Sequence, residues 1–187
     1  MFARREASAG DRVAVPVDTS LLVADALAAV GAEVTYTPVG DAFVAAETTA
    51  PDVVFGGEPS GAWIWPEQTQ CPDGPLAACT LAALVETEGS LAAMVDALPT
   101  YPIRRDTVRT DAKSAIVDRV GEIAAAEYDD VSTLDGVRVE MDAGWFLVRA
   151  SGTEPVVRIT AEARDKSDAD ALFETAHDLI ERADRER

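Results

Sequence analysis

Residues 12–39 contain the pattern that most restricts the fold: a strand, a helix and a second strand in close succession. The segment "RVAVPVD" reads as a short buried strand. It is followed by "LLVADALAAVG", with helical apolar spacing, a possible cap at Ser20 and a stop at Gly31. The next segment, "EVTYTPV", alternates as strands do. Three such elements in about 28 residues form the βαβ unit of parallel sheets layered with helices. The first half is therefore expected to be α/β.

The rest of this half predicts two more strands and two helices. Strands are expected at 53–55 and 63–65, on either side of a turn rich in Gly and Pro. Asp73 and Gly74 open the helix "PLAACTLAALVET", and "SLAAMVDAL" forms another. Pro99 and Pro102 bracket a segment that cannot continue a helix. We expect one domain of residues 1–98, a linker of about 99–105 and a second domain of 106–187.

The second half predicts a small α+β domain with a largely antiparallel sheet. Strands are expected at 103–108 and in "GVRVEM", "WFLVRA" and "VVRITAEA". A helix at 111–126 presents Ile116, Val120 and Ile123 to the core. The closing amphipathic helix is expected to bury five residues and to carry His177 as a structural residue; the five are Leu172, Phe173, Ala176, Leu179 and Ile180.

The net charge of the chain limits the classes of partner that it can bind. There are 34 acidic and 16 basic residues, a formal net charge of -18. Such a surface repels nucleic acid and anionic membranes. The acidic residues are spread along the chain, which favours adaptation to high salt over a dedicated acidic interface. Cys71 and Cys79 form no CxxC pair or Cys/His cluster, and no apolar run spans a bilayer, so we expect reduced thiols in a soluble cytoplasmic protein.

The loop "RASGTEPVVRI" at 149–159 is the first candidate site. Arg149 ends a predicted strand and Arg158 lies on the next, close to it if the two strands pair. Ser151 and Thr153 supply hydroxyls, and a turn at Gly152 frees backbone N–H groups. Guanidinium, hydroxyl and amide donors together suit a phosphate dianion. The alternative is a tight hairpin whose arginines pair with acidic residues.

The loop "GGEPSG" at 56–61 is the second. Glu58 and Ser60 offer an acceptor and a donor to neighbouring sugar hydroxyls, with Gly57 in the supporting backbone. Gly40 and Asp41, in "PVGDAF", follow another strand and are candidates for the same cleft. The alternatives are a polar hairpin for "GGEPSG" and an N-cap for Asp41. The nearby tryptophans, Trp63 and Trp65, are expected to be core or interface residues more than a sugar platform.

These motifs together resemble the C-terminal half of the α-D-phosphohexomutases, the phosphoglucomutases and phosphomannomutases. The matching pieces, in family order, are "VDTSLLVADAL", "PVGDAFVAA", "FGGEPSGAWIWPE", "CPDGPLAA" and "RASGTEPVVRITAEA". The resemblance implies the third family domain, an α/β layer with a mixed sheet. It also implies the fourth, a TATA-binding-protein-like α+β domain with helices on one face of an antiparallel sheet.

The resemblance also implies roles. Glu58 and Ser60 would contact sugar hydroxyls, while Arg149, Ser151, Gly152, Thr153 and Arg158 would hold the phosphate that does not react. Complete family enzymes use a phosphorylated serine, a Mg²⁺-binding DGDxDR loop and a hexose bisphosphate activator. No such serine loop or DGDxDR occurs here, and Ala62 stands where many bacterial members carry histidine. We therefore expect a truncated mutase half with no catalytic or metal residue of its own.

Two functions follow from this comparison. The first is a mutase half that binds a hexose phosphate, needs an N-terminal mutase half for turnover and is inactive alone. The second is a noncatalytic sugar-phosphate-binding or regulatory module. The preferred hexose and the oligomeric state are not encoded in these motifs.

Overall fold

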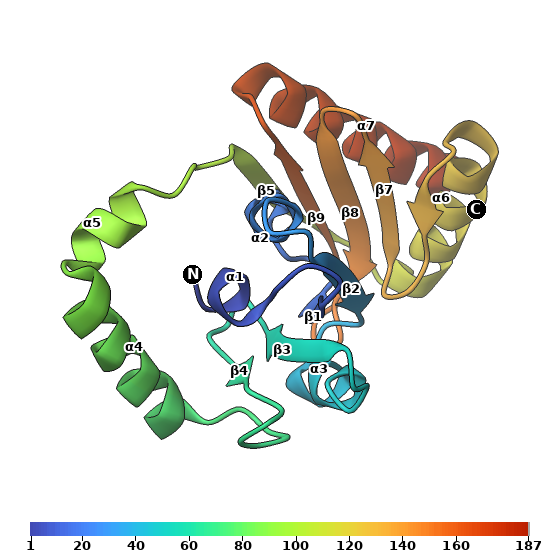
Figure 1. Cartoon of the computed structure of the whole chain (residues 1–187). Coiled ribbons are helices and arrows are strands. Elements are labelled where there is room, and N and C mark those ends of the chain that lie inside the picture. Colours follow the sequence, from blue (N-terminus) through green and yellow to red (C-terminus); the bar gives the residue numbers. More distant parts are fainter. Residues whose placement is uncertain (187) are drawn as a thin grey trace. The chain divides into compact units, whose positions relative to one another are not determined.

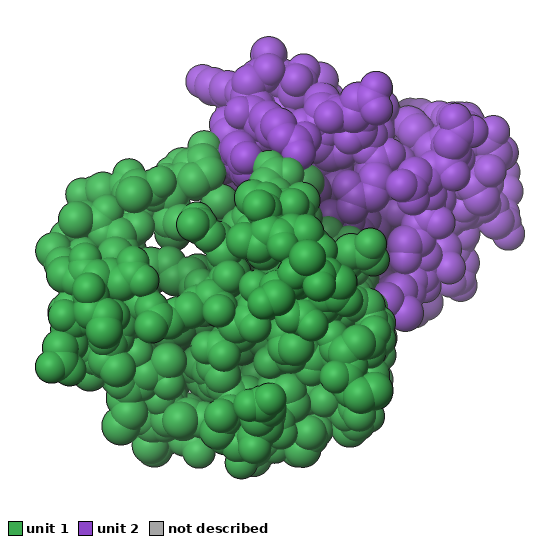
Figure 2. Space-filling model, viewed as in Figure 1, with its two compact units in different colours: residues 1–100 green, residues 101–187 purple. Residues whose placement is uncertain are grey.

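The computed structural model describes residues 1–186, and the chain divides into two compact units, Met1–Thr100 and Tyr101–Arg187 (Figure 2). The division falls inside the 99–105 segment expected to be a linker. Each unit has hydrophobic clusters made only of its own residues.

The first unit is built on a four-stranded mixed sheet between helices (Figure 1). The strand order is β2-β1-β3-β4; β1 runs parallel to β2 and β3, and β4 is antiparallel to β3. The strands are β1 (Arg12–Pro16), β2 (Glu33–Thr37), β3 (Val53–Gly57) and β4 (Trp63–Ile64). The predicted α/β fold with a mixed sheet is therefore confirmed.

Two of the five helices of this unit begin at the predicted caps. Ser20 Oγ accepts from Leu22 N–H at 3.1 Å, and Asp73 Oδ1 accepts from Leu76 N–H at 2.8 Å. Such caps satisfy N–H groups that a helix leaves unpaired at its start. The helices are α1 (Phe2–Glu6), α2 (Leu21–Ala28), α3 (Asp41–Glu47), α4 (Gly74–Glu88) and α5 (Leu91–Asp96). The sequence pattern does not predict α1. It offers α3 only through the alternative in which Asp41 caps a helix, and in the structure Gly40 is the N-cap and Asp41 the first residue of α3.

The tryptophans of the first unit are packing residues. Phe2 of α1 meets the rings of Trp63 and Trp65 edge-on, at centroid distances of 5.1 and 5.2 Å. Trp65 is buried, and Trp63 is partly buried against the same cluster. Edge-to-face aromatic pairs of this kind stabilise a core. Their interpretation as core residues is confirmed.

The second unit is a five-stranded antiparallel sheet with two helices on one face (Figure 1). The strand order is β5-β9-β8-β7-β6, and every neighbouring pair is antiparallel. The strands are β5 (Ile103–Arg109), β6 (Val131–Ser132), β7 (Val137–Met141), β8 (Gly144–Ala150) and β9 (Val156–Ala163). The helices are α6 (Lys113–Glu127) and α7 (Lys166–Arg185). The predicted α+β fold is confirmed.

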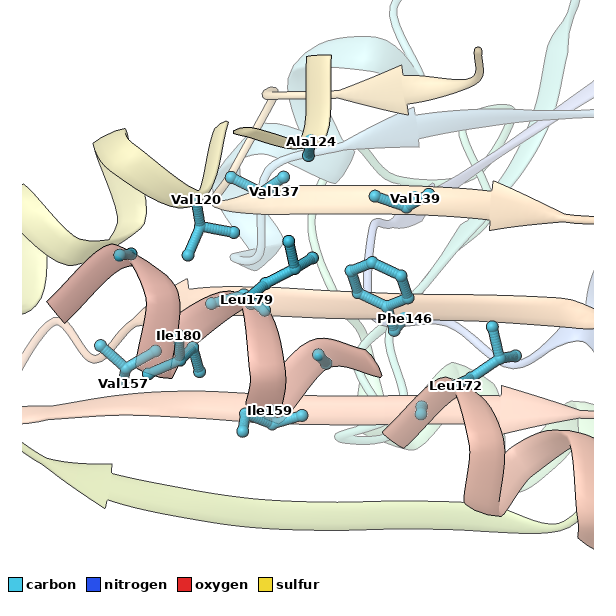
Figure 3. Packing of buried hydrophobic residues seen from close by; sticks show 14 of the residues in the cluster. Val120, Ala124, Val137, Val139, Phe146, Val157, Ile159, Leu172, Leu179 and Ile180 are labelled. Atoms are coloured by element: carbon cyan, nitrogen blue, oxygen red, sulfur yellow. The ribbon is translucent and has the colours of Figure 1, made fainter. Parts of the chain in front are cut away.

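Side chains from α6 and α7 pack on this sheet in a continuous core (Figure 3). Val120, Leu179 and Ile180 lie over Phe146 and the neighbouring strands. Burying one such side chain contributes about 1.5–3 kcal/mol. The strands that flank the loop between β8 and β9 are therefore held in place by the core.

One predicted core residue needs correction. Phe173 is only partly buried, because it lies at the edge of the cluster and meets the His177 ring edge-on at 4.7 Å. His177 Nε2 in turn lies 3.2 Å from Asp106 Oδ2 on β5. His177 thus joins α7 to the edge strand, in agreement with a structural role.

Candidate functional site

The Glu58 carboxylate is held by two donors from different parts of the first unit. The backbone N–H of Gly40 donates to Oε1 at 2.8 Å, and the Ser60 hydroxyl donates to Oε2 at 3.0 Å. The loop itself is a hairpin between β3 and β4, closed by Glu58 N–H to Ala62 O at 2.9 Å. Each carboxylate oxygen keeps a second lone pair. The group is therefore fixed in place and still able to accept from a ligand.

Gly40, Asp41 and Gly57 are expected to share a site with Glu58, and Gly40 contacts its carboxylate. Asp41 belongs to helix α3, and Gly57 belongs to strand β3. Gly40 is the N-cap of α3 at φ 140, a conformation that favours glycine, and Asp41 is the exposed first residue of that helix. Gly57 ends β3, where a Cβ would lie 3.1 Å from both Phe55 Cε1 and Trp63 Cδ1. Close packing therefore accounts for glycine at Gly57.

The loop between β8 and β9 leaves two backbone N–H groups free. Within residues 1–186, the N–H groups of Gly152 and Thr153 have no hydrogen-bond acceptor. A Cβ at Gly152 would meet nothing within 4 Å. The third amide, of Glu154, donates to Ser151 Oγ at 3.3 Å, so the Ser151 hydroxyl also shapes the turn. Thr153 is exposed.

The two arginines of this loop lie side by side on the sheet and are each paired with a carboxylate. Arg149 and Arg158 are register partners on β8 and β9, so both point to one face. Arg149 Nη1 lies 3.3 Å from Asp135 Oδ2, and Arg158 Nη2 lies 2.7 Å from Glu154 Oε2. The expected strand pairing is confirmed. The acid-paired arginines of the hairpin alternative are also observed.

Asp135 reaches Arg149 from a turn that only glycine can complete. Gly136 has φ 83, and a Cβ there would lie 2.5 Å from Val148 O and 2.9 Å from Arg149 Cα. Both features exclude a side chain, because the left-handed conformation and the backbone clash each cost free energy. The backbone of the turn at Gly136 therefore packs directly against strand β8, which carries Arg149.

Lys113, the first residue of α6, binds the back of the same loop. Its Nζ donates to Glu154 O at 3.0 Å and to Ser151 O. Thr110, just before the helix, donates its N–H to Pro155 O at 3.0 Å. Three carbonyls of the loop are thus fixed by the segment between β5 and α6.

Family models cover both units. One, described as phosphoglucomutase/phosphomannomutase, alpha/beta/alpha domain III, matches residues 1–101, and a second, described as the C-terminal domain of the same proteins, matches residues 107–179. The chain belongs to the phosphoglucomutase/phosphomannomutase family. Its two units correspond to domains III and IV, in agreement with the resemblance seen in the motifs.

Curated proteins similar to this phosphoglucomutase/phosphomannomutase family member are probable phosphoglucosamine mutases. A probable phosphoglucosamine mutase of Methanococcoides burtonii is 46% identical over 184 residues, which cover 98% of this chain and 41% of the relative. One of Methanopyrus kandleri is 45% identical and covers 91% of this chain and 38% of the relative. The chain thus spans about two fifths of the length of these relatives.

Solved family structures share the fold. A phosphoglucomutase/phosphomannomutase family protein from Burkholderia thailandensis superposes with a TM-score of 0.84 at 23% identity, covering 98% of this chain and 40% of that one. The N-acetylphosphoglucosamine mutase of Aspergillus fumigatus, solved with GlcNAc-6P and magnesium, gives a TM-score of 0.62 at 14% identity and covers 93% of this chain and 39% of that one. At these identities the likeness is one of fold.

The residues described in this chain do not suit the Mg²⁺ that the family implies. Over residues 1–186, no group of three or more His, Cys, Asp or Glu side chains is placed to hold a metal ion. We therefore assign no step of a reaction to a metal bound by these residues. Among the same residues, no helix is long and apolar enough to cross a membrane.

The sequence analysis does not name three residues that contact the β8–β9 loop or its arginines. Glu154 lies within the motif but is not singled out there, while Asp135 and Lys113 are 14 and 38 residues distant from their partners. The sequence does mark Lys113 as unusual, because Lys113 and Lys166 are the only lysines in a chain whose other basic residues are mostly arginines.

Proposed function

We propose that this chain is the substrate-recognition half of a phosphohexomutase, which moves phosphate between C1 and C6 of a hexose through a bisphosphate intermediate. The observation that carries the proposal is the loop between β8 and β9, with two free amides beside two arginines on one face. Family membership supports it.

In this proposal the β8–β9 loop holds the phosphate that does not react. Arg149 and Arg158 supply charge-assisted hydrogen bonds, and the free N–H groups of Gly152 and Thr153 donate to the remaining oxygens. A phosphate dianion would replace Asp135 and Glu154 as the partner of the two guanidinium groups. The Ser151 and Thr153 hydroxyls complete the set of donors.

Glu58 and Ser60 are proposed to bind sugar hydroxyls. A carboxylate fixed on both oxygens accepts hydrogen bonds from neighbouring hydroxyls without first losing side-chain freedom. It can do so for either orientation of the hexose, as a transfer between C1 and C6 requires. Since similar curated relatives are named phosphoglucosamine mutases, glucosamine phosphate is the substrate we propose to test first.

The chain alone is proposed to bind without turnover. Its 187 residues include neither a TxSxSHNP-like serine loop nor a DGDxDR sequence. Phosphoryl transfer needs a nucleophile and stabilisation of the charge on the transferring group, in addition to correct positioning. The missing groups are proposed to come from an N-terminal mutase half.

The test is a titration with glucosamine 6-phosphate, followed by calorimetry and by a coupled assay for glucosamine 1-phosphate. We expect the chain to bind and not to convert the sugar. Conversion should appear when the N-terminal domains of the Methanococcoides burtonii relative are added. An Arg149→Met chain, purified identically, serves as the control, because a contaminating mutase would remain active in it.

The binding and turnover results together distinguish the proposed mutase half from a noncatalytic binding module. Turnover by the chain alone, absent from the Arg149→Met preparation, would disprove the proposed division of labour. Binding without turnover in any mixture would favour the alternative, a noncatalytic sugar-phosphate-binding module. Absence of binding would reject both functions.

A further inference from the structure

Lys113 holds the β8–β9 loop by its carbonyl groups. The ammonium donates to Ser151 O and Glu154 O, which lie three residues apart at the two ends of the turn. Lysine carries three N–H donors on one nitrogen and can therefore serve two converging carbonyls. These bonds tie the turn from residue 151 to residue 154 to the first turn of α6.

This contact fixes the direction of a free amide. The peptide unit between Ser151 and Gly152 is planar and trans, so its C=O and N–H point in opposite directions. With the Ser151 carbonyl held on Lys113, the Gly152 N–H points away from the ammonium. That N–H is one of the two without an acceptor among residues 1–186.

The helix itself gains nothing from a lysine at this position. Lys113 is the first residue of α6, where the partial positive charge of the helix N-terminus disfavours a cation. No acidic residue in the first turn compensates, and the N-cap Ala112 makes no side-chain cap. The carbonyl contacts therefore account for lysine here better than helix stability does.

We propose that Lys113 is a positioning residue for anion binding: it holds the 151–154 turn in the conformation that aims the Gly152 N–H at a bound phosphate. The inference rests on the proposed function of that loop. Lys113 does not touch the phosphate in this proposal and acts through the backbone.

The test compares Lys113→Met with Lys166→Met in the full chain. Lys166 is the first residue of α7, so the control removes the same charge from the same helical position away from the loop. We expect Lys113→Met to weaken binding of inorganic phosphate and of glucosamine 6-phosphate about tenfold, the loss typical of charge-assisted hydrogen bonds. Lys166→Met should remain within about twofold of the parent chain.

A second readout separates positioning from a general loss of structure. In amide NMR spectra without ligand, the Gly152 and Thr153 signals should move in Lys113→Met and return in Lys113→Arg, which keeps donors and charge. Phosphate affinity should return with them. If Lys113→Met does not fold, Lys113→Leu provides the same comparison with another side chain that has no donor.

The outcomes are distinguishable. If the parent chain binds neither probe, the proposed function fails, while the ligand-free spectra still decide whether Lys113 sets the loop. If the parent chain binds and Lys113→Met binds equally well with unchanged amide signals, the role of Lys113 is disproved. Loss of affinity without rescue by arginine would likewise contradict it.

Discussion

Glu58 is the central residue of the loop between β3 and β4, because two donors from separate segments meet on its carboxylate. Gly40 lies 18 residues earlier in the chain and Ser60 two residues later. An amide in place of the carboxylate would offer one acceptor oxygen instead of two. The carboxylate accepts from both groups through its two oxygens, and Glu58→Gln tests whether the second acceptor and the charge are needed.

We expect Glu58→Gln to weaken glucosamine 6-phosphate binding by about tenfold or more, because the Ser60 hydroxyl and the sugar lose a charged acceptor. Inorganic phosphate, which needs only the β8–β9 loop, should bind as it does to the parent chain. Isothermal titration with both ligands measures the difference. Glu67→Gln, at an exposed glutamate elsewhere in the unit, is the matched control. Equal losses for both ligands would argue against a sugar-specific role.

The sequence can name the candidate residues of the β8–β9 loop, but not the residues that contact them. Arg149, Arg158, Gly152 and Thr153 could be named because motif and strand pattern place them together. The contacts of Lys113 could not be predicted, since they depend on how α6 begins beside a loop 38 residues later. The acid partners were likewise undetectable in a chain with 34 acidic residues, almost any of which could pair with an arginine.

At the level of elements, one ion pair joins the ends of α6 and α7. Arg182 donates to both oxygens of Glu127, one of them at 2.9 Å. The Arg182 guanidinium holds the pKa of the Glu127 carboxyl below its ordinary value of 4.5. A lowered carboxyl pKa means that the folded state favours the ionised form. The pair therefore stabilises the fold above that ordinary value and loses its effect as the pH falls through the lowered pKa.

Glu127→Gln should make the melting temperature less sensitive to acid. Between about pH 6 and about pH 3.5, the parent chain should lose more of its thermal stability than the variant, because only the parent must protonate a paired carboxylate. Circular dichroism melts at both pH values measure this. Glu174→Gln, at an exposed glutamate of α7, should leave the pH dependence as it is in the parent. An unchanged pH dependence in Glu127→Gln would contradict the expectation.

Elements with strong periodicity were predictable, and those formed by tertiary contact were not. The sequence located α7 through its apolar stripe, and four of its five predicted core residues are buried. The five-residue helix α1 is too short to show a period and is held by the contact of Phe2 with two tryptophans. Phe173 follows the helical pattern yet lies at the edge of the core, which periodicity alone cannot distinguish.

The excess of negative charge over the full chain opposes folding. A net charge of -18 spread over both units creates repulsion that only nearby arginines and dissolved ions can relieve. Many arginines are engaged in ion pairs, among them Arg12 with Asp52 and Arg119 with Glu186. Such exposed pairs offset part of the repulsion, and the rest depends on the solvent.

We therefore expect the melting temperature to rise with salt. Molar KCl shortens the Debye length to about 3 Å and screens carboxylate repulsion. Differential scanning calorimetry from dilute to molar KCl measures the change, with sucrose of equal osmolality as the control for excluded volume. A melting temperature that is the same in dilute and molar KCl would show that net charge does not limit stability.

The outer strands of the second sheet also bear on how the protein behaves at high concentration. An unpaired strand edge can add a strand from another molecule and so start aggregation, unless it is short or charged. One edge, β6, has two residues, and the other, β5, carries Arg105, Asp106 and Arg109 at exposed positions. Salt that screens the carboxylates would also weaken repulsion between molecules. The short β6 edge and the charged side chains of the β5 edge therefore disfavour intermolecular strand pairing at salt concentrations that screen the net charge.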